Sequence, residues 1–571
     1  MARVRNGADL LCDTLANAGV EHVFGVPGTQ SIDLWEALRQ RGKPRPIVAT
    51  SELAASFMAN GYARASGRVG VLVTIPGPGF TYALTGLAEA LLDSVAVLHI
   101  AGAPARRPDG GYALQAIAQA EVAGPLVKRV ITVESAEGIA PALLEGLELA
   151  SSGEPGPVYL QLPESVLREP GARDADPASP PPTRHLGPDV ERAVKLLAAA
   201  RRPLLLCGQG AAGAAELVGS LAEALPAPVL TTTSGRGVIP ETHQCSLPFD
   251  SPGAPPAVVN QLVDAADLVL ALGVKFSHNG SLGFALRLPP ERLIRVDASS
   301  EVLARGYRAQ ISIQADARSF LARAKDGLES GNASTWDGEA IAGWRRQLAE
   351  TAAAIEEPRL AGCTPSDVFA ALRRALSDSS VVATDSGLHQ YLVRRHLQVL
   401  RPRTLLVPAD LQSMGFGIPA AIGAAVATNE PAVAVVGDGG FAIAGLELAT
   451  AVRAGLPLIV VVLVDGSFGL IRLQQLRRTG HTSGVDLPRI DLNLVAAAVG
   501  ATYYRLEQAN LDSVFETAVA SGAVTLVEVG VGAGGGLARA RAQGLGVSAA
   551  TSLLGPSATK RLVEAVRRRR S

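Results

Sequence analysis

Two aspartates, Asp438 and Asp465, each follow a short apolar run that predicts a buried strand. Asp438 lies in a glycine-rich turn formed with Gly437, Gly439 and Gly440. Such a turn between a strand and a helix lets phosphate approach backbone N–H groups, and the helix N-terminus favours an anion. A carboxylate adds a hard oxygen ligand for a divalent cation. The turn therefore predicts a site for a metal-bound phosphate.

The second aspartate, Asp465, follows the next apolar run along the chain, residues 458–463. Parallel strands joined by a helix bring their carboxyl ends to one crevice, which is the usual ligand position in open α/β sheets. We therefore expect Asp438 and Asp465 to share one magnesium ion, with phosphate oxygens and a water completing its shell. The alternative is that each aspartate only caps a helix or shapes a turn.

The surroundings of both aspartates resemble the signature of the thiamine-diphosphate-dependent enzymes, in the branch of acetolactate synthase and pyruvate decarboxylase. That signature is Gly-Asp-Gly followed after a spacer by Asn or Asp, and the acetolactate-synthase-like branch adds Glu-Leu-Ala-Thr-Ala, found here at 447–451. The resemblance implies thiamine diphosphate and Mg²⁺ as cofactors. It implies Asp438, Asp465 and the carbonyl of Ser467 as metal ligands, with Asp465 standing where many relatives have asparagine.

The same resemblance assigns further residues to the cofactor. The segment 385–390 follows a strand and resembles the family's Gly-Gln-His-Gln, which binds the diphosphate. The segment after Asp465 resembles Tyr-Gly-Met-Val-Arg-Gln-Trp-Gln. The additional cofactor-binding candidates from these two segments are Gly387, His389, Gln390, Phe468, Gly469 and Leu470.

Met414 lies in a glycine-rich loop that leads into an apolar helix, residues 413–423. A lone Met in such a setting is usually core filler. This stretch resembles the family's Thr-Met-Gly-Tyr-Gly-x-Pro-Ala-Ala-Ile-Gly, in which the bulky residue holds the two cofactor rings in a V. The carbonyl of Gln412 is then expected to orient the pyrimidine amino group, at a position where relatives usually have glycine.

Glu52 opens a predicted helix after the strand 46–49. A carboxylate in a first helical turn is commonly explained by the helix dipole alone. The segment resembles His-Glu-x-x-Ala-x-x-x-Ala-x-Gly-Tyr-Ala-Arg, in which the Glu binds N1′ of the pyrimidine and drives its tautomerisation; Ser51 replaces the His. A carboxylate suits this task because N1′ must gain and lose a proton repeatedly.

The loop at residues 25–30, which precedes Glu52 in the chain, is the candidate substrate site. By resemblance it overhangs the reactive carbon of the cofactor, although an ordinary turn remains the alternative. Gln474 stands where biosynthetic synthases have the Trp that favours 2-oxobutyrate as acceptor. The substrate candidates are Val26, Pro27, Gly28, Thr29, Gln30, Gln115 and Gln474.

The segment 208–213 spells Gly-x-Gly-x-x-Gly after a strand, which taken alone predicts NAD or FAD binding. The fingerprint also requires an acid at the end of the next strand, and 229–233 contains none. Some relatives hold a structural FAD in a Rossmann-like middle domain, but 273–278 departs from the sequence of those synthases. The sequence therefore leaves FAD possible and favours its absence.

Short apolar runs alternate with alanine-rich segments along the whole chain, which predicts buried parallel strands with helical crossovers. The fold class is α/β, with three doubly wound parallel-sheet domains. We predict a pyrimidine-binding domain at 1–170, a Rossmann-like middle domain at 189–330, a diphosphate-binding domain at 364–531 and a C-terminal tail at 532–571. The linkers are expected at 169–188 and 330–363.

The composition is that of a globular protein, with 48% hydrophobic and 18% charged residues. A formal net charge of −1 gives no reason to expect nucleic acid or an anionic membrane as a partner. Four cysteines without a Cys-x-x-Cys pair favour a reducing cytoplasm.

The sequence thus predicts decarboxylation of a small 2-oxo acid followed by carboligation to a second carbonyl, in the manner of acetolactate synthase. A simple decarboxylase that releases an aldehyde is the first alternative. A Rossmann-type NAD or FAD oxidoreductase is the alternative from another class, followed by a non-catalytic subunit. Because relatives place the Glu and the metal site on different subunits, we expect a homodimer or homotetramer with active sites at subunit interfaces.

Overall fold

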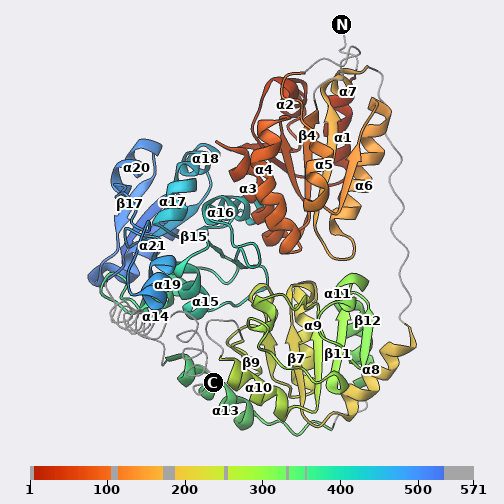
Figure 1. Cartoon of the computed structure of the whole chain (residues 1–571), viewed down its shortest axis with the longest axis vertical. Coiled ribbons are helices and arrows are strands. Elements are labelled where there is room, and N and C mark those ends of the chain that lie inside the picture. The colour runs from red at the N-terminus through yellow and green to blue at the C-terminus, as the bar shows by residue number, and fades with distance from the viewer. Residues whose placement is uncertain are drawn as a thin grey trace, which may run out of the picture.

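The computed structural model describes residues 5–103, 113–170, 187–249, 255–328, 333–353 and 357–532. These residues form three six-stranded sheets in which every strand pair is parallel, with helices packed against the sheets (Figure 1). The predicted α/β class with three parallel-sheet domains is confirmed. The exact domain boundaries stay predictions, and the tail beyond residue 532 lies outside the described residues.

The first sheet has the strand order β2-β1-β3-β4-β6-β5. Its strand β3 sends Leu72 to one face and Val71 and Val73 to the other, so both faces are buried against helices. The strands are β1 (His22–Gly25), β2 (Arg45–Val48), β3 (Gly70–Thr74), β4 (Val97–Ala103), β5 (Arg129–Thr132) and β6 (Pro157–Pro163). The main helices are α1 (Gly7–Asn17), α2 (Ile32–Arg41), α3 (Glu52–Ser66), α4 (Pro78–Leu92) and α6 (Ile139–Ser151).

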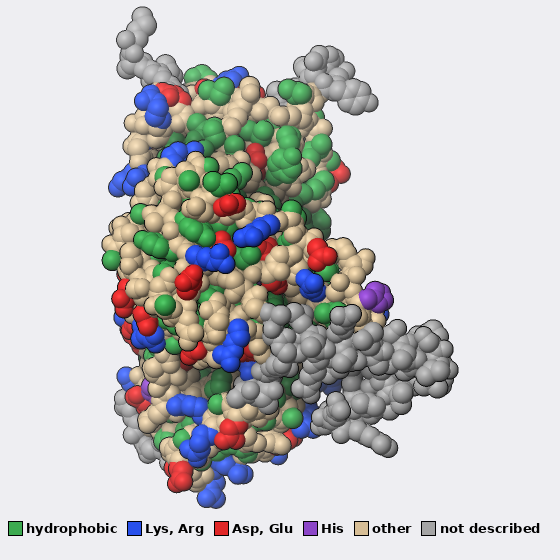
Figure 2. Space-filling model, turned by 90° about the vertical axis from the view of Figure 1, so that its left-hand side faces the viewer, with side chains coloured by type: hydrophobic (Ala, Val, Ile, Leu, Met, Phe, Trp, Pro, Cys, Tyr) green, Lys and Arg blue, Asp and Glu red, His purple; other side chains and the backbone are tan. Residues whose placement is uncertain are grey.

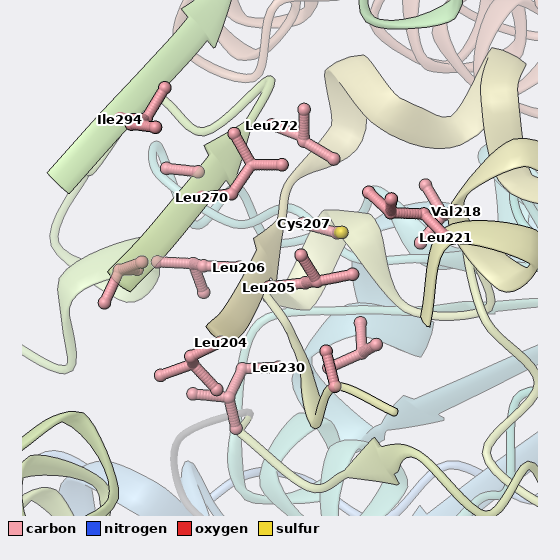
Figure 3. Packing of buried hydrophobic residues seen from close by; sticks show 14 of the residues in the cluster. Leu204, Leu205, Leu206, Cys207, Val218, Leu221, Leu230, Leu270, Leu272 and Ile294 are labelled. Carbon is pink, nitrogen blue, oxygen red and sulfur yellow. The ribbon is translucent and has the colours of Figure 1, made fainter. Parts of the chain in front are cut away.

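The second sheet has the order β12-β11-β10-β7-β8-β9, and Figure 3 shows Leu205 on the side of Val218 and Leu221 of α9, with Leu204 and Leu206 on the other side. Its strands are β7 (Pro203–Cys207), β8 (Val229–Thr231), β9 (Ser246–Leu247), β10 (Leu268–Leu272), β11 (Leu293–Asp297) and β12 (Ile311–Gln314). Its helices are α8 (Pro188–Ala199), α9 (Ala215–Ala224), α10 (Pro256–Ala265), α11 (Ser300–Ala304) and α12 (Ala317–Leu328).

The segment expected to be a linker at 330–363 contains a helix, α13 (Gly338–Ala353). Ile341 and Leu348 on this helix are buried in the core of the middle domain. The sequence signal missed this because the segment is charged on its outer positions and contributes only a few apolar residues to the core.

The third sheet has the order β14-β13-β15-β16-β18-β17. Its strands are β13 (Val381–Thr384), β14 (Leu405–Leu406), β15 (Ala432–Gly437), β16 (Leu458–Val464), β17 (Thr502–Arg505) and β18 (Thr525–Gly530). Its helices are α14 (Pro365–Ala375), α15 (Leu388–His396), α16 (Gly417–Thr428), α17 (Asp438–Ala444), α18 (Leu448–Ala454), α19 (Gly469–Thr479), α20 (Leu492–Val499) and α21 (Leu511–Ser521).

Helices α3 and α16 pack side by side and join the first domain to the third (Figure 1). A Cβ on Gly61 would collide with the backbone of Ala420, and a Cβ on Gly423 would collide with the carbonyl of Met58. These pairings run in opposite directions along the two helices, so the helices are antiparallel. Side chains of both domains form one continuous apolar cluster around this seam.

Within the described parts of the chain, none of the helices has the length and apolar character needed to cross a membrane. The four cysteines are buried free thiols.

Candidate active site

A cavity lies beyond the carboxyl ends of three neighbouring strands, β13, β15 and β16. This is the edge at which an open parallel sheet binds its ligand. Most of the residues that the sequence assigned to the cofactor line this cavity. They are Gly387, His389, Met414, Gly437, Asp438, Gly439, Gly440, Asp465, Ser467, Phe468, Gly469 and Leu470.

The two aspartates meet at this cavity, and both carboxylates hold the loop that follows β16. Oδ2 of Asp438 accepts the N–H groups of Asp465 and Gly466 at 2.9 and 2.8 Å. Oδ1 of Asp465 accepts the N–H and the hydroxyl of Ser467 at 2.8 and 3.0 Å. Burial raises the pKa of Asp465, the two bonds from Ser467 lower it, and the neighbouring Asp438 carboxylate raises it again. Two adjacent carboxylates of this kind suit a divalent cation.

The donor set also indicates which cation fits. Among the described residues, no group of three or more His, Cys, Asp or Glu side chains lies close enough together to hold a metal ion. A cation at Asp438 and Asp465 would therefore need other oxygen ligands, such as phosphate and water. Magnesium prefers such a shell, because it keeps few carboxylates and binds substrate or cofactor phosphates.

His389 provides a polar group that faces the cavity. Its ring is buried, and Nε2 has no hydrogen-bond partner among the described residues. Burial lowers the pKa of His389 to about 4, although a hydrogen bond to the backbone of Asp385 raises it. A Cβ on Gly387 would collide with this ring, and one on Gly437 would lie 3.0 Å from Nδ1. An anion in the cavity could accept a hydrogen bond from this nitrogen.

Met414 is held by a residue that sequence reasoning did not single out, Asp385. This buried carboxylate accepts the N–H groups of Gly415 and Phe416 at 2.8 and 3.4 Å. Burial raises the pKa of Asp385 to about 6, against the effect of these backbone donors. A Cβ on Gly440 would collide with Oδ2 of Asp385. Asp385 therefore locks the turn after Met414 onto the glycine turn that follows β15.

Two other predicted cofactor residues do not line the cavity. Gln412 has a φ of +63°, and its amide donates to the carbonyl of Ala409 at 2.7 Å. Few residues other than glycine adopt this backbone conformation. The amide of Gln390 lies 3.4 Å from the carbonyl of Pro408, so it points at the segment before Gln412.

Glu52 begins α3, whose N-cap Ser51 accepts the N–H of Ala54 at 3.2 Å. The side chain is buried, and a Cβ on Gly79 would lie 2.9 Å from its Oε1. The preceding Thr50 donates its N–H at 3.1 Å and its hydroxyl to Glu447 of the third domain. Sequence reasoning matched Glu447 only as part of a motif, and the structure shows that it anchors the loop before Glu52.

The substrate candidates of the first domain lie at the same end of that domain as Glu52. The amide of Gln30 donates to Oε1 of Gln115 at 2.6 Å. A Cβ on Gly28 and a Cβ on Gly79 would both collide with Ile75. These residues therefore form a second group, which we call the Glu52 half-site. Gln474 is not part of it, because it lies exposed on α19 in the third domain.

Within one chain the Glu52 half-site lies apart from the cavity around Asp438, Asp465 and Met414, which we call the metal half-site. Glu52 lies beside Gly79 at the start of α4, whereas Ser413, next to Met414, donates its N–H to Glu89 near the end of α4. Ten helical residues separate Gly79 from Glu89, which is roughly 15 Å at 1.5 Å per residue. The structure therefore does not bring Glu52 and Met414 together in a single chain.

The Gly-x-Gly-x-x-Gly segment of the middle domain has a packing explanation. A Cβ on Gly208 would collide with the carbonyl of Gly273, and a Cβ on Gly210 would lie 2.8 Å from the Cα of Gly273. The first two glycines thus allow the ends of β7 and β10 to approach closely. Lys275 crosses from this point to the first domain, where its Nζ pairs with Glu154 at 2.7 Å.

Comparison with known proteins adds three family matches. The thiamine pyrophosphate enzyme N-terminal TPP binding domain matches residues 5–122, the central domain matches 190–324, and the C-terminal TPP binding domain matches 385–529.

The chain is also similar to acetolactate synthases from distant organisms. It is 32% identical to the acetolactate synthase isozyme 3 large subunit of Escherichia coli, over 82% of this chain and 84% of that protein. It is 32% identical to the chloroplastic acetolactate synthase 2 of Nicotiana tabacum, over 82% and 72% of the two chains. It is 30% identical to a probable acetolactate synthase large subunit of Methanocaldococcus jannaschii, over 81% of each.

Proposed function

Because this chain belongs to the thiamine pyrophosphate enzyme family, we propose that it decarboxylates a small 2-oxo acid and joins the product to a second carbonyl. This is an acetolactate-synthase-like reaction with thiamine diphosphate and Mg²⁺ as cofactors. The observation that carries the proposal is one cavity lined by two paired aspartates, an orphaned histidine nitrogen and Met414.

Each residue of the metal half-site has a task in this proposal. Asp438, Asp465 and the carbonyl of Ser467 hold the cation, and His389 binds a phosphate oxygen through its unpartnered nitrogen. Met414, in the lining of the cavity, would support the rings of the cofactor. Thiamine diphosphate, when bound, supplies the electron sink that decarboxylation requires.

Glu52 holds and moves the proton at N1′ of the pyrimidine, and the carbonyl of Gln412 orients the amino group. Burial of Glu52 keeps water away from this proton, which helps a positioned carboxylate act as acid and base. Gln30 and Gln115, bonded to each other at one end of the first domain, orient the 2-oxo acid.

We propose that the working unit is at least a homodimer, with each active site built from two chains. The antiparallel packing of α3 and α16 supports this, because it puts Glu52 and Met414 at opposite ends of this helix pair. Exposed apolar side chains also support it: Tyr82 is 63% exposed, Leu114 81% and Leu446 67%. Figure 2 shows apolar side chains gathered in the upper half of one face. A second copy would cover such surfaces.

The test of the activity uses apoprotein reconstituted with thiamine diphosphate and Mg²⁺. Pyruvate is added, and carbon dioxide, acetolactate, acetoin and acetaldehyde are measured. Carbon dioxide together with a carboligation product supports the proposal, whereas carbon dioxide with aldehyde alone makes the chain a simple decarboxylase. Absence of carbon dioxide release from a screen of small 2-oxo acids contradicts both.

For the middle domain we propose that no FAD is needed. The close packing of Gly208 and Gly210 on Gly273 supports this, since the motif has a structural purpose without a dinucleotide. Purified protein is then expected to show no flavin absorbance and to keep its activity when FAD is omitted. We also propose a cytoplasmic location, which the four buried free thiols support.

A further inference from the structure

The segment 407–413, which we call the strap, leads from β14 to Met414 and is held by the first domain. Its anchors in that domain are three buried side chains, Arg64, Glu89 and Asp93, and Asn279 of the middle domain also donates to the carbonyl of Ala409. We call these three residues the anchor cluster. None of them lines the cofactor cavity, and no part of the proposed mechanism uses them.

Each member of the anchor cluster binds backbone atoms of the strap. Nη1 of Arg64 donates to the carbonyl of Val407 at 3.0 Å. The carboxylate of Asp93 accepts the N–H groups of Ala409 and Asp410, both at 2.9 Å. Further along, Oε2 of Glu89 accepts the N–H of Ser413 at 3.2 Å. The last of these bonds lies one residue before Met414.

The turn that the cluster holds needs an external support. Gln412 has a φ of +63°, a conformation that costs free energy for a residue with a side chain. The bond from Ser413 to Glu89 fixes the backbone immediately after it. Glu89 therefore acts on both residues that the proposed function places against the cofactor from this turn, Gln412 and Met414.

The charges of the cluster do not balance without a proton. Nη2 of Arg64 lies 2.7 Å from Asp93 and 3.9 Å from Glu89, so one guanidinium serves two carboxyl groups. Glu89 is fully buried, and its Oε1 has no hydrogen-bond partner within the described chain. Burial and then the charge of Asp93 raise the pKa of Glu89, while Arg64 and Ser413 lower it. A buried carboxylate without its own counter-ion is costly, and a retained proton removes this cost.

We propose that Glu89 is a positioning residue of the cofactor site, whose protonated carboxyl holds the turn that carries Gln412 and Met414. Loss of its proton leaves the Glu89 and Asp93 carboxylates to share one guanidinium, and their repulsion displaces the turn and weakens cofactor binding. The inference rests on the proposed function, because it presumes that the turn contacts thiamine diphosphate. Arg64 from α3 and Asp93 from the end of α4 face Glu89, and Asp410 and Lys275 lie beyond Asp93.

The direction of the pH effect follows from the raised pKa. Between the ordinary pKa of a glutamate, 4.5, and its raised value in the fold, the folded protein binds more protons than the unfolded chain. Stability from this group is therefore full at low pH and is lost as the pH rises through the raised pKa. Cofactor affinity falls in the same direction if the charged form disturbs the turn.

The experiment measures the dissociation constant of thiamine diphosphate with Mg²⁺ by calorimetry on apoprotein across the neutral and alkaline range. The first variant is Glu89→Gln, whose side chain keeps the shape of glutamate and can donate a hydrogen bond but cannot ionise. The matched control is Glu148→Gln, which replaces an exposed glutamate on α6. The thermal midpoint of each apoprotein is recorded over the same range, as a readout independent of the cofactor.

For wild type and Glu148→Gln, we expect the dissociation constant to rise with pH by up to about tenfold per unit, the limit for one coupled proton. Glu89→Gln is expected to show a weaker dependence and a flatter profile of the apoprotein midpoint. If Glu89→Gln follows the wild-type profile, or folds but binds no cofactor at any pH, Glu89 does not hold the turn through its proton. If wild type itself binds no thiamine diphosphate at any pH, the proposed function fails, and this inference fails with it.

Discussion

Glu52, Asp385 and Asp438 are carboxylates whose surroundings suit three different tasks. Glu52 lies at a buried helix start beside Gly79, where a ligand nitrogen can share its proton. Asp385 is saturated by backbone N–H groups and therefore supports the turn beside it. Asp438 holds the neighbouring loop with one oxygen and faces the cavity. Their different surroundings lead to different expected effects of substitution.

Replacing Glu52 by Gln is expected to lower the turnover of a 2-oxo acid by about 10²–10⁴-fold, the usual contribution of a positioned acid or base. The amide keeps the shape of the side chain but cannot exchange a proton. Initial rates of carbon dioxide release measure the effect, with Glu148→Gln as an exposed control. Unchanged turnover in Glu52→Gln would show that the proton is handled elsewhere.

The two metal-site aspartates are expected to differ. Asp438→Ala removes a proposed metal ligand and the acceptor of two N–H groups, so the thermal stabilisation by thiamine diphosphate with Mg²⁺ should disappear. Asp465→Asn keeps a ligand oxygen and removes a like charge, so the stabilisation should persist. Thermal unfolding with each cofactor alone and with both measures this. Equal loss in both variants would contradict the assigned roles.

The sequence predicted the residues that touch the cavity better than the residues that hold them. Asp438 and His389 belong to segments whose chemistry is dictated by a ligand, so their types and spacing could be recognised. Asp385, Glu447 and Glu89 bind backbone or side-chain groups of distant segments. The sequence around such a carboxylate shows no characteristic residue spacing, because its hydrogen-bond partner depends on which loops come together in the folded protein.

At the scale of elements, strands buried on both faces gave a clearer sequence signal than half-exposed strands. The runs 203–207, 381–384 and 458–463 are apolar except for Thr384 and correspond closely to β7, β13 and β16. The edge strands β5 and β17 are half-exposed and carry arginine and threonine or tyrosine, so they give no apolar run. Burial on two faces produces the signal that the prediction used.

The seam between α3 and α16 makes a prediction about glycine. Gly61→Ala would place a Cβ on the backbone of Ala420, which cannot move independently of its helix, and should destabilise the protein by about 1–3 kcal/mol. Gly219→Ala in α9 is the matched control, since nothing lies within 4 Å of its Cβ. That control should gain about 0.5–1 kcal/mol from helix propensity. Chemical denaturation measures both changes.

A stable Gly61→Ala variant would mean that the two helices can separate without loss, and the seam would then contribute little to the fold.

At the scale of the whole molecule, each chain carries two half-sites that cannot meet within it. The Glu52 half-site is anchored by Glu447 of the third domain, and the turn before Met414 is anchored by Glu89 of the first. Within one chain, the third domain thus supports the Glu52 half-site, and the first domain supports the turn before Met414. In the proposed homodimer, a complete site takes its complementary half from a second copy.

Mixed dimers test this arrangement. Glu52→Gln and Asp438→Ala chains are each expected to be inactive alone, but a heterodimer contains one site with both residues intact. Random assortment after co-expression should restore about a quarter of the wild-type activity per site. Purification through two different affinity tags isolates the heterodimer. No recovered activity in that heterodimer would contradict a site shared between chains.

The glycine contacts of α3 with α16 also limit how such enzymes can be recombined. Because side chains of the first and third domains form one apolar cluster, the two domains fold as partners even though the middle domain separates them along the chain. A chimera that takes only its third domain from a relative would set a foreign α16 against Gly61 and Met58. Exchanges between relatives should therefore transfer α3 and α16 together.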